Sequence, residues 1–210
     1  EFVDAPTYMQ MVNEANDNNN SQHIFPDSAI EFTRTGKDPV NYPNTDWMKL
    51  ILKPTAFSQS HTVSVSGGNS IARFAVNANY LKQDGIMANT SANRFSLRAN
   101  TSVTLKQNLL MYLDLAVMRK EQTLPIQRYG SIGGPGPEYI FWELYRVPPT
   151  VRAKYPAWPD GYQAYGKFGD MQNPLAELER GGYSQGKVDI INMNFQPQWN
   201  ITPDLKLKGQ

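Results

Sequence analysis

The chain has 210 residues, no cysteine and a formal net charge of +1. That length allows one large domain or two small ones, and the near-neutral charge gives no field that would favour nucleic acid. The absence of cysteine excludes disulfides and thiolate metal sites, and no apolar run approaches the roughly 20 residues of a membrane helix.

Residues 1–57 are expected to be helical or irregular. Asp4 is a capping residue and Pro6 suits a first turn, which predicts a short helix at the start of the chain. A second helix is predicted from Asp27 to a stop at Gly36. The connector that follows holds two prolines, which argue against regular structure there.

Residues 58–120 read as four antiparallel strands. After the turn at Gly67–Ser70, Phe74 and Val76 alternate with Arg73 and Asn77. Such a period of two is typical of strands, because successive side chains point to opposite faces of a sheet. Further positions extend the two stripes: the apolar ones are Ala78, Phe95, Leu97, Leu113 and Leu115, and the polar ones are Arg94, Arg98 and Asp114.

Residues 121–186 form a long insert with a short helix, and residues 187–210 hold a fifth strand and the start of a sixth. Loops of such length usually carry function. The insert concentrates aromatic residues, which offer flat faces to a substrate or a partner: Tyr129, Trp142, Trp158, Tyr162 and Tyr165. In the alternative, Phe141, Trp142 and Tyr145 have near-helical spacing and form a small core that folds the loop.

Two features favour a membrane barrel over a soluble sandwich. Short connections alternate with longer ones, and several strands reach the 9–11 or so residues that cross a bilayer. Six strands with open edges would be a poor membrane structure, so the chain is expected to be part of a larger assembly. The predicted fold class is all-β with small helical loop elements, as a partial transmembrane antiparallel β-barrel.

Several motifs, in this order and spacing, resemble the SusC/RagA family of TonB-linked outer-membrane transporters of Bacteroidetes. They lie at residues 41–47, 59–68, 80–86 and 94–98, and a further strand–turn–strand match lies at residues 199–206. The resemblance covers essentially the whole chain.

The resemblance implies a segment of a 22-stranded barrel in the outer membrane that imports oligosaccharides or oligopeptides. It also implies a SusD-like surface lipoprotein as a lid, membrane lipid around the barrel, and TonB acting through an N-terminal plug that these residues are expected to lack. Polar positions would then face the lumen and the plug: Arg73, Asn77, Arg94, Arg98 and Asp114.

An enzyme is not expected. His23 and His61 have no carboxylates at ligand spacing, so neither a metal site nor a cofactor is predicted. Gly133–Gly136 lacks the Gly-Lys-Ser/Thr ending of a phosphate loop and reads as a turn. The alternative function is a secreted or surface β-rich carbohydrate-binding module, which would be soluble without detergent.

Overall fold

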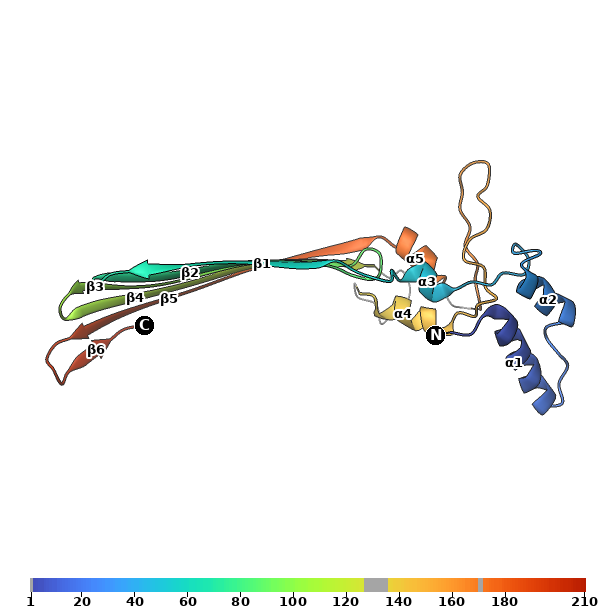
Figure 1. Cartoon of the computed structure of the whole chain (residues 1–210), viewed down its shortest axis with the longest axis horizontal. Coiled ribbons are helices and arrows are strands. Elements are labelled where there is room, and N and C mark those ends of the chain that lie inside the picture. The colour runs from blue at the N-terminus through green and yellow to red at the C-terminus, as the bar shows by residue number, and fades with distance from the viewer. Residues whose placement is uncertain (1, 127–135, 170–171) are drawn as a thin grey trace. The chain divides into compact units, whose positions relative to one another are not determined.

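The computed structural model describes residues 2–126, 136–169 and 172–210 (Figure 1). Its elements follow in the order α1 (Ala5–Asn18), α2 (Asp27–Thr35), α3 (Trp47–Ile51), β1 (Ser58–Gly68), β2 (Ala72–Asp84), β3 (Ser91–Lys106), β4 (Leu109–Pro125), α4 (Glu138–Arg146), α5 (Pro174–Arg180), β5 (Tyr183–Asn200) and β6 (Lys206–Lys208).

The chain divides into two compact units. The sheet unit comprises Ala56–Gly85, Ser91–Thr123 and Gln185–Gln210. The helical unit comprises Glu1–Thr55, Ile86–Thr90 and Leu124–Ser184. Each unit therefore collects segments that are far apart in the sequence.

The sheet unit is one sheet in which the strands follow their chain order, β1-β2-β3-β4-β5-β6. β1, β2, β3 and β4 pair antiparallel with a continuous register, apart from a shift between Thr104 and Lys106. β1 to β5 run side by side along this unit, and β6 pairs only with the last residues of β5 (Figure 1). A mostly antiparallel, open sheet with a few small helices is consistent with part of a β-barrel, as the sequence predicts.

The turn between β1 and β2 depends on glycine and asparagine. Gly68 has φ 151°, and a Cβ there would overlap the carbonyl oxygen of Ala72. The Asn69 side chain accepts hydrogen bonds from the backbone N–H groups of Ile71 (2.8 Å) and Ala72 (2.9 Å). This side chain satisfies backbone donors at the reversal, as Asx turns do, so the predicted tight turn is confirmed.

The register places the predicted stripes on two faces of the sheet. Val76 pairs with Val65 of β1 and with Ala99 of β3, whereas Asn77 pairs with Ser64 and Arg98. We call these the apolar face and the polar face. The alternation predicted from the sequence is therefore continuous across neighbouring strands.

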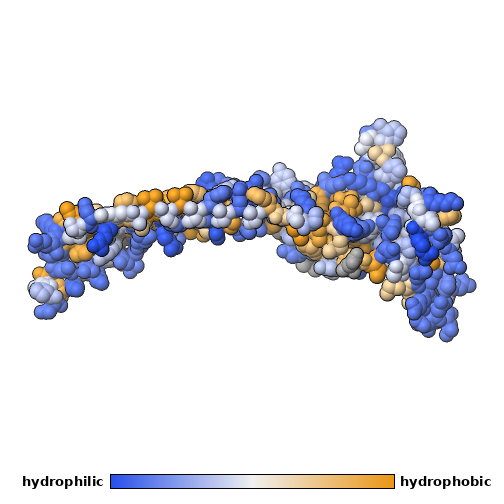
Figure 2. Space-filling model, in the orientation of Figure 1, coloured by the Kyte–Doolittle hydropathy of each residue, from blue (hydrophilic) through white to orange (hydrophobic). Residues whose placement is uncertain are grey.

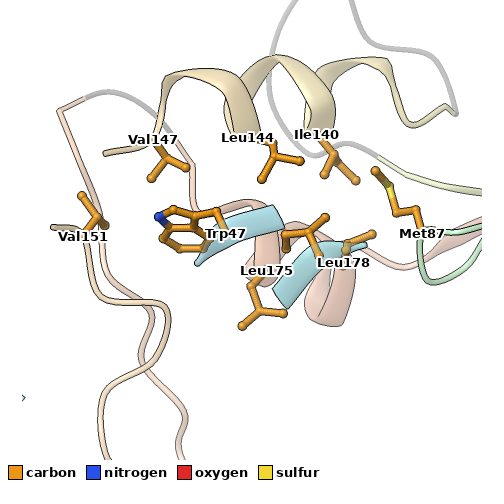
Figure 3. Packing of buried hydrophobic residues seen from close by; sticks show 9 residues of the cluster. Trp47, Met87, Ile140, Leu144, Val147, Val151, Leu175 and Leu178 are labelled. Atoms are coloured by element: carbon orange, nitrogen blue, oxygen red, sulfur yellow. The ribbon is translucent and has the colours of Figure 1, made fainter. Parts of the chain in front are cut away.

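The helical unit has its own hydrophobic core, built by α3, α4, α5 and the connection between β2 and β3. The buried members are Trp47, Ile51, Met87, Ile140, Leu144, Val147, Val151, Leu175 and Leu178. Their side chains converge in Figure 3, where Trp47 lies below Leu144 and Val147. Three chain segments that attach to the same end of the strands thus fold as one body.

The sequence accounts for the bounds of the first two helices. Asp4 accepts a hydrogen bond from the Thr7 N–H (3.0 Å) at the start of α1, as predicted. Asp27 begins α2 and Pro26 precedes it, while Gly36 ends the helix at φ 63°. Across the described residues, no helix is long and apolar enough to span a membrane.

Candidate functional site

Hydrogen bonds link neighbouring strands along the polar face. The Nδ2 of Asn77 donates to Ser64 Oγ (2.6 Å) between β2 and β1. Asp114 on β4 accepts from Asn100 of β3 (2.6 Å) and from Asn194 of β5 (3.4 Å). Asn194 thereby shares a face with Asp114, which extends the polar face onto β5.

Three arginines on the polar face have no acidic partner among the described residues. β2 carries Arg73, and β3 carries Arg94 and Arg98. No ion pair involves any of the three in the part of the chain that the structure describes. Arg98 also lines a shallow groove of about 560 Å³ on this part of the sheet, together with Asn77 and Asn192. The polar face therefore offers guanidinium groups to a partner beyond this sheet.

The apolar face carries large hydrophobic side chains that nothing in the described chain covers. Val63 is 65% exposed and Met193 is 73% exposed, and Phe74, Phe95 and Leu113 are also exposed. Figure 2 shows apolar residues lined up along the strands. So large an exposed apolar surface is unusual for a soluble monomer and marks a contact with lipid or protein.

An aromatic hairpin, residues 154–165, projects from the helical unit as the orange loop in Figure 1. Lys154 and Tyr165 form its base as an isolated antiparallel bridge, and the Trp158 N–H donates to the Tyr162 carbonyl (3.0 Å) near its tip. Trp158 and Tyr162 meet edge to face at 5.8 Å, and each is 60% exposed. The structure brings these two predicted site residues together on an exposed tip.

Tyr165 has a different place from the two tip residues. Its hydroxyl donates to Glu179 Oε2 (2.6 Å), while Lys154 Nζ lies 2.6 Å from Glu179 Oε1. Partial burial disfavours the ionised form of Glu179, but the hydrogen bonds from Lys154 and Tyr165 outweigh it and lower the pKa of this carboxyl. Tyr165 also packs against the core, so it anchors the hairpin.

Trp142 lies on the outer side of α4. Its ring stacks on Tyr139 at 5.3 Å, and the guanidinium of Arg146 lies 4.1 Å from the ring centroid. These neighbours are three residues before and four residues after Trp142, so they flank the ring along the helix. Ile140 and Leu144 enter the core instead, whereas Trp142 and Tyr145 stay exposed and only Phe141 packs against it.

A polar cleft of about 1030 Å³ separates the aromatic hairpin from α5. Its lining includes Asp160, Tyr162, Gln163, Tyr165, Gln172, Glu177 and Arg180. Two phenol rings among amide, carboxylate and guanidinium groups suit a ligand that offers many hydroxyl or amide groups. The residues on the α5 side, Gln172, Glu177 and Arg180, were not predicted from the sequence.

Glu143 is a fully buried carboxylate in the helical unit. Its Oε1 accepts a hydrogen bond from the Gln172 N–H (2.9 Å), and its Oε2 is also buried. Burial, with the nearby charge of Glu177, raises the pKa of Glu143 to about 7 despite hydrogen bonds that favour ionisation. Sequence reasoning missed it, although it lies between Ile140 and Leu144 on the core side of α4.

Three further positions considered in the sequence analysis are Tyr129, His23 and His61. Tyr129 lies outside the described residues. Among the described residues, His23 hydrogen-bonds to Asp17 (2.8 Å) and His61 to Gln59 (3.4 Å). No group of three His, Cys, Asp or Glu side chains within residues 2–126, 136–169 and 172–210 could hold a metal ion.

An open antiparallel sheet with one exposed apolar face and one hydrogen-bonded polar face is consistent with part of a membrane β-barrel. The chain is 26% identical over 166 residues to TonB-dependent receptor P3 of Formosa agariphila, covering 79% of the chain and 16% of that protein. It is 30% identical over 90 residues to TonB-dependent receptor P26 of the same organism, covering 43% of the chain and 9% of that protein.

These similarities support the TonB-dependent receptor family for this chain. The chain spans only 16% and 9% of the lengths of those two proteins. No family model matches it.

Proposed function

We propose that the sheet unit is part of the wall of an outer-membrane β-barrel in a TonB-dependent importer. One observation carries this proposal: strands of 11 to 18 residues, β1 to β5, keep an exposed apolar face opposite a hydrogen-bonded polar face. Outer-membrane barrels have this alternation, with the apolar side toward lipid and the polar side toward the lumen. TonB-dependent receptors are transporters rather than enzymes, which agrees with this role.

The polar face would then line the lumen and meet a plug domain. Arg73, Arg94 and Arg98 have no acidic partner in the described residues. A guanidinium in a partly dehydrated lumen is stabilised by a carboxylate that accepts two parallel hydrogen bonds from one of its edges. Acidic side chains of a plug would supply such partners, and Asn77 and Asp114 would add hydrogen bonds beside them. TonB would act on the importer through that plug.

The helical unit would form an external body that meets the incoming substrate and a SusD-like lipoprotein lid. The N-terminal segment, the β2–β3 connection and the insert share its core, and antiparallel order attaches all three to the same end of the strands. Trp158 and Tyr162 at the exposed hairpin tip supply aromatic area of the kind that dominates protein interfaces. This assignment corresponds to the SusC/RagA type of importer.

The polar cleft beside the hairpin would take part in substrate capture. Its lining offers Tyr162 and Tyr165 as apolar surfaces, with Gln172 and Arg180 as hydrogen-bond donors. An oligosaccharide or an oligopeptide presents the matching combination of polar groups and apolar patches. Trp142 is less suited to stacking on a ligand, because Tyr139 and Arg146 already lie against its ring.

The wall proposal is tested with single cysteines in the full-length transporter, since this chain has none of its own. Cysteines at Val76 and Leu97 should react with a lipid-soluble probe, and those at Asn77 and Arg98 should not. Val76 and Asn77 are neighbours on β2, and Leu97 and Arg98 are neighbours on β3. In each strand the position on the polar face is therefore the control for the position on the apolar face. If all four were water-accessible and the protein stayed soluble without detergent, the carbohydrate-binding module would replace the importer.

A further inference from the structure

The apolar face changes character at one end of the strands, in successive rows of paired residues. Val63, Ala78, Leu97 and Val117 form one row across β1 to β4. The next row on the same face holds His61, Tyr80, Phe95 and Arg119, and the one after it holds Gln59, Lys82, Asn93 and Glu121. Aliphatic side chains thus give way to a row that mixes aromatic side chains with His61 and Arg119, and then to a row of charged or polar ones.

β5 shows the same change. Ile191 and Met193 are 69% and 73% exposed apolar residues, and Asp189 and Lys187 come next on this face. Arg119 forms a two-bond ion pair with Asp189 (2.6 and 3.1 Å), and Lys187 lies 3.7 Å from Glu121. Because these contacts join β4 to β5, the charged positions of both strands face the same side.

The height of the apolar rows fits one bilayer. From Phe95 to Val103 the face stays free of charge on β3, which at about 3.4 Å per residue is roughly 27 Å along the strand. A strand tilt of about 40° reduces this to roughly 21 Å along the membrane normal, close to the ~25 Å apolar band of outer-membrane barrels. Tyr80 and Phe95 lie opposite each other on β2 and β3, at the end of the apolar rows. Aromatic side chains are enriched at this depth, where the membrane meets water.

The strands continue beyond the charged row. β3 begins at Ser91, β4 runs to Pro125 and β5 begins at Tyr183. A small depression of about 240 Å³ spans the charged row and the stretch beyond it, and polar residues line it: Ser91, Asn93, Glu121, Gln122, Thr123, Gln185, Gly186 and Lys187. Such a surface hydrogen-bonds to water and headgroups and is strongly disfavoured in hydrocarbon.

We propose that Lys82, Asn93, Arg119, Glu121, Lys187 and Asp189 form a headgroup rim, which contacts the polar headgroups of the outer leaflet. The inference rests on the proposed barrel wall and adds where the membrane ends on it. Tyr80 and Phe95 lie at the hydrocarbon boundary, and the strands beyond the headgroup rim stand above the bilayer as a water-exposed collar. The ion pairs Arg119–Asp189 and Lys187–Glu121 place charges of both signs on the rim, and these suit the polar headgroups.

The test uses the full-length transporter in lipid vesicles with a fluorophore on single cysteines. Leu97→Cys and Val117→Cys report on the apolar rows, and Asn93→Cys and Glu121→Cys on the headgroup rim. Ser96→Cys, on the polar face of the same strand, is the matched control. Quenching is compared between lipids with a nitroxide on the headgroup and lipids with a nitroxide midway along the acyl chain.

The two apolar sites should be quenched at least twofold more by the chain nitroxide than by the headgroup nitroxide, and the two rim sites should show the reverse. Ser96→Cys should respond to neither. Rim sites quenched by the chain nitroxide as strongly as Leu97→Cys, or by no lipid at all, would overturn the rim while leaving the barrel wall intact. If Leu97→Cys and Val117→Cys escaped both quenchers, the proposed wall itself would fail.

Discussion

The Glu143 carboxylate accepts a hydrogen bond from the backbone N–H of Gln172 at 2.9 Å, and so fixes the chain before α5 to the core side of α4. A fully buried carboxylate in this position couples the folding of the helical unit to pH. Its pKa is raised to about 7, so the folded unit holds a proton that the unfolded chain releases near its ordinary value of 4.5.

We therefore predict that the helical unit loses stability as pH rises. The contribution of Glu143 to the free energy of unfolding should be complete below pH 4.5 and be lost as pH rises through 7, by at most about 3 kcal/mol. Hydrogen exchange of α4 and α5 in the full transporter, corrected for intrinsic rates, should be faster at pH 8 than at pH 5. Glu143→Gln keeps an acceptor for Gln172 without the charge and should remove the difference; a difference that survives this change would assign the effect to another group.

We predict a large asymmetry for an arginine placed on the two faces of β2. Val76→Arg should reduce barrel stability by about 2–4 kcal/mol if the site lies near the bilayer midplane, because the charge would face hydrocarbon. Asn77→Arg, the adjacent position on the polar face, should cost much less. Folded fraction against denaturant in detergent or lipid measures both. Equal losses would mean that β2 does not separate lipid from lumen.

We predict that Trp47 links the N-terminal segment to the insert. It is buried, and its Nε1–H donates to the carbonyl of Pro148 (3.1 Å), 101 residues away. Trp47→Ala should cost about 3–5 kcal/mol, and Trp47→Phe about 1 kcal/mol for the hydrogen bond. Limited proteolysis should then cut the insert faster in Trp47→Ala, whereas Trp158→Ala, an exposed control, should leave the rate unchanged.

We predict that the hairpin tip and the hairpin base have separable roles. Trp158→Ala with Tyr162→Ala should weaken lid association or uptake by 1 kcal/mol or more, as expected for aromatic anchors of an interface. Tyr165→Phe removes the hydrogen bond to Glu179 and should loosen the hairpin without affecting the tip contacts. Binding of the lid protein to the full transporter, with barrel expression as control, separates the two. Unchanged binding and uptake in the double variant would make the hairpin a passive loop.

The two faces of the sheet could be predicted from the sequence because a period of two is a local property. Phe74, Val76 and Asn77 needed no distant partner to be assigned to a face, and the Gly67–Gly68 turn has a local steric cause. The strand ends were harder. β4 runs past Lys120 to Pro125 and β5 begins at Tyr183, where charged residues replace apolar ones on the apolar face and the pattern is lost.

The core of the helical unit could not be predicted, because its members meet only in three dimensions. Trp47 lies at the end of a proline-rich connector, and Met87 lies in a short link between strands, yet both are buried with Leu144. In α4 the aromatic spacing suggested that Trp142 and Tyr145 face inward. Ile140, Glu143 and Leu144 do so instead. Which side of α4 faces inward depends on where the helix begins and on the α5 residues that pack against it, and the sequence pattern gives neither.

The 101-residue separation between Trp47 and Pro148 has a consequence for folding kinetics. Closing so long a loop costs conformational entropy before the contacts that stabilise it can form. The strand hairpins join segments that are close in sequence, so their loops cost less to close. We therefore expect the strand pairs to form first and the helical unit last, when α5 completes the core. Until then the apolar sides of α3 and α4 stay open to water, and transiently exposed apolar surface of this kind favours aggregation.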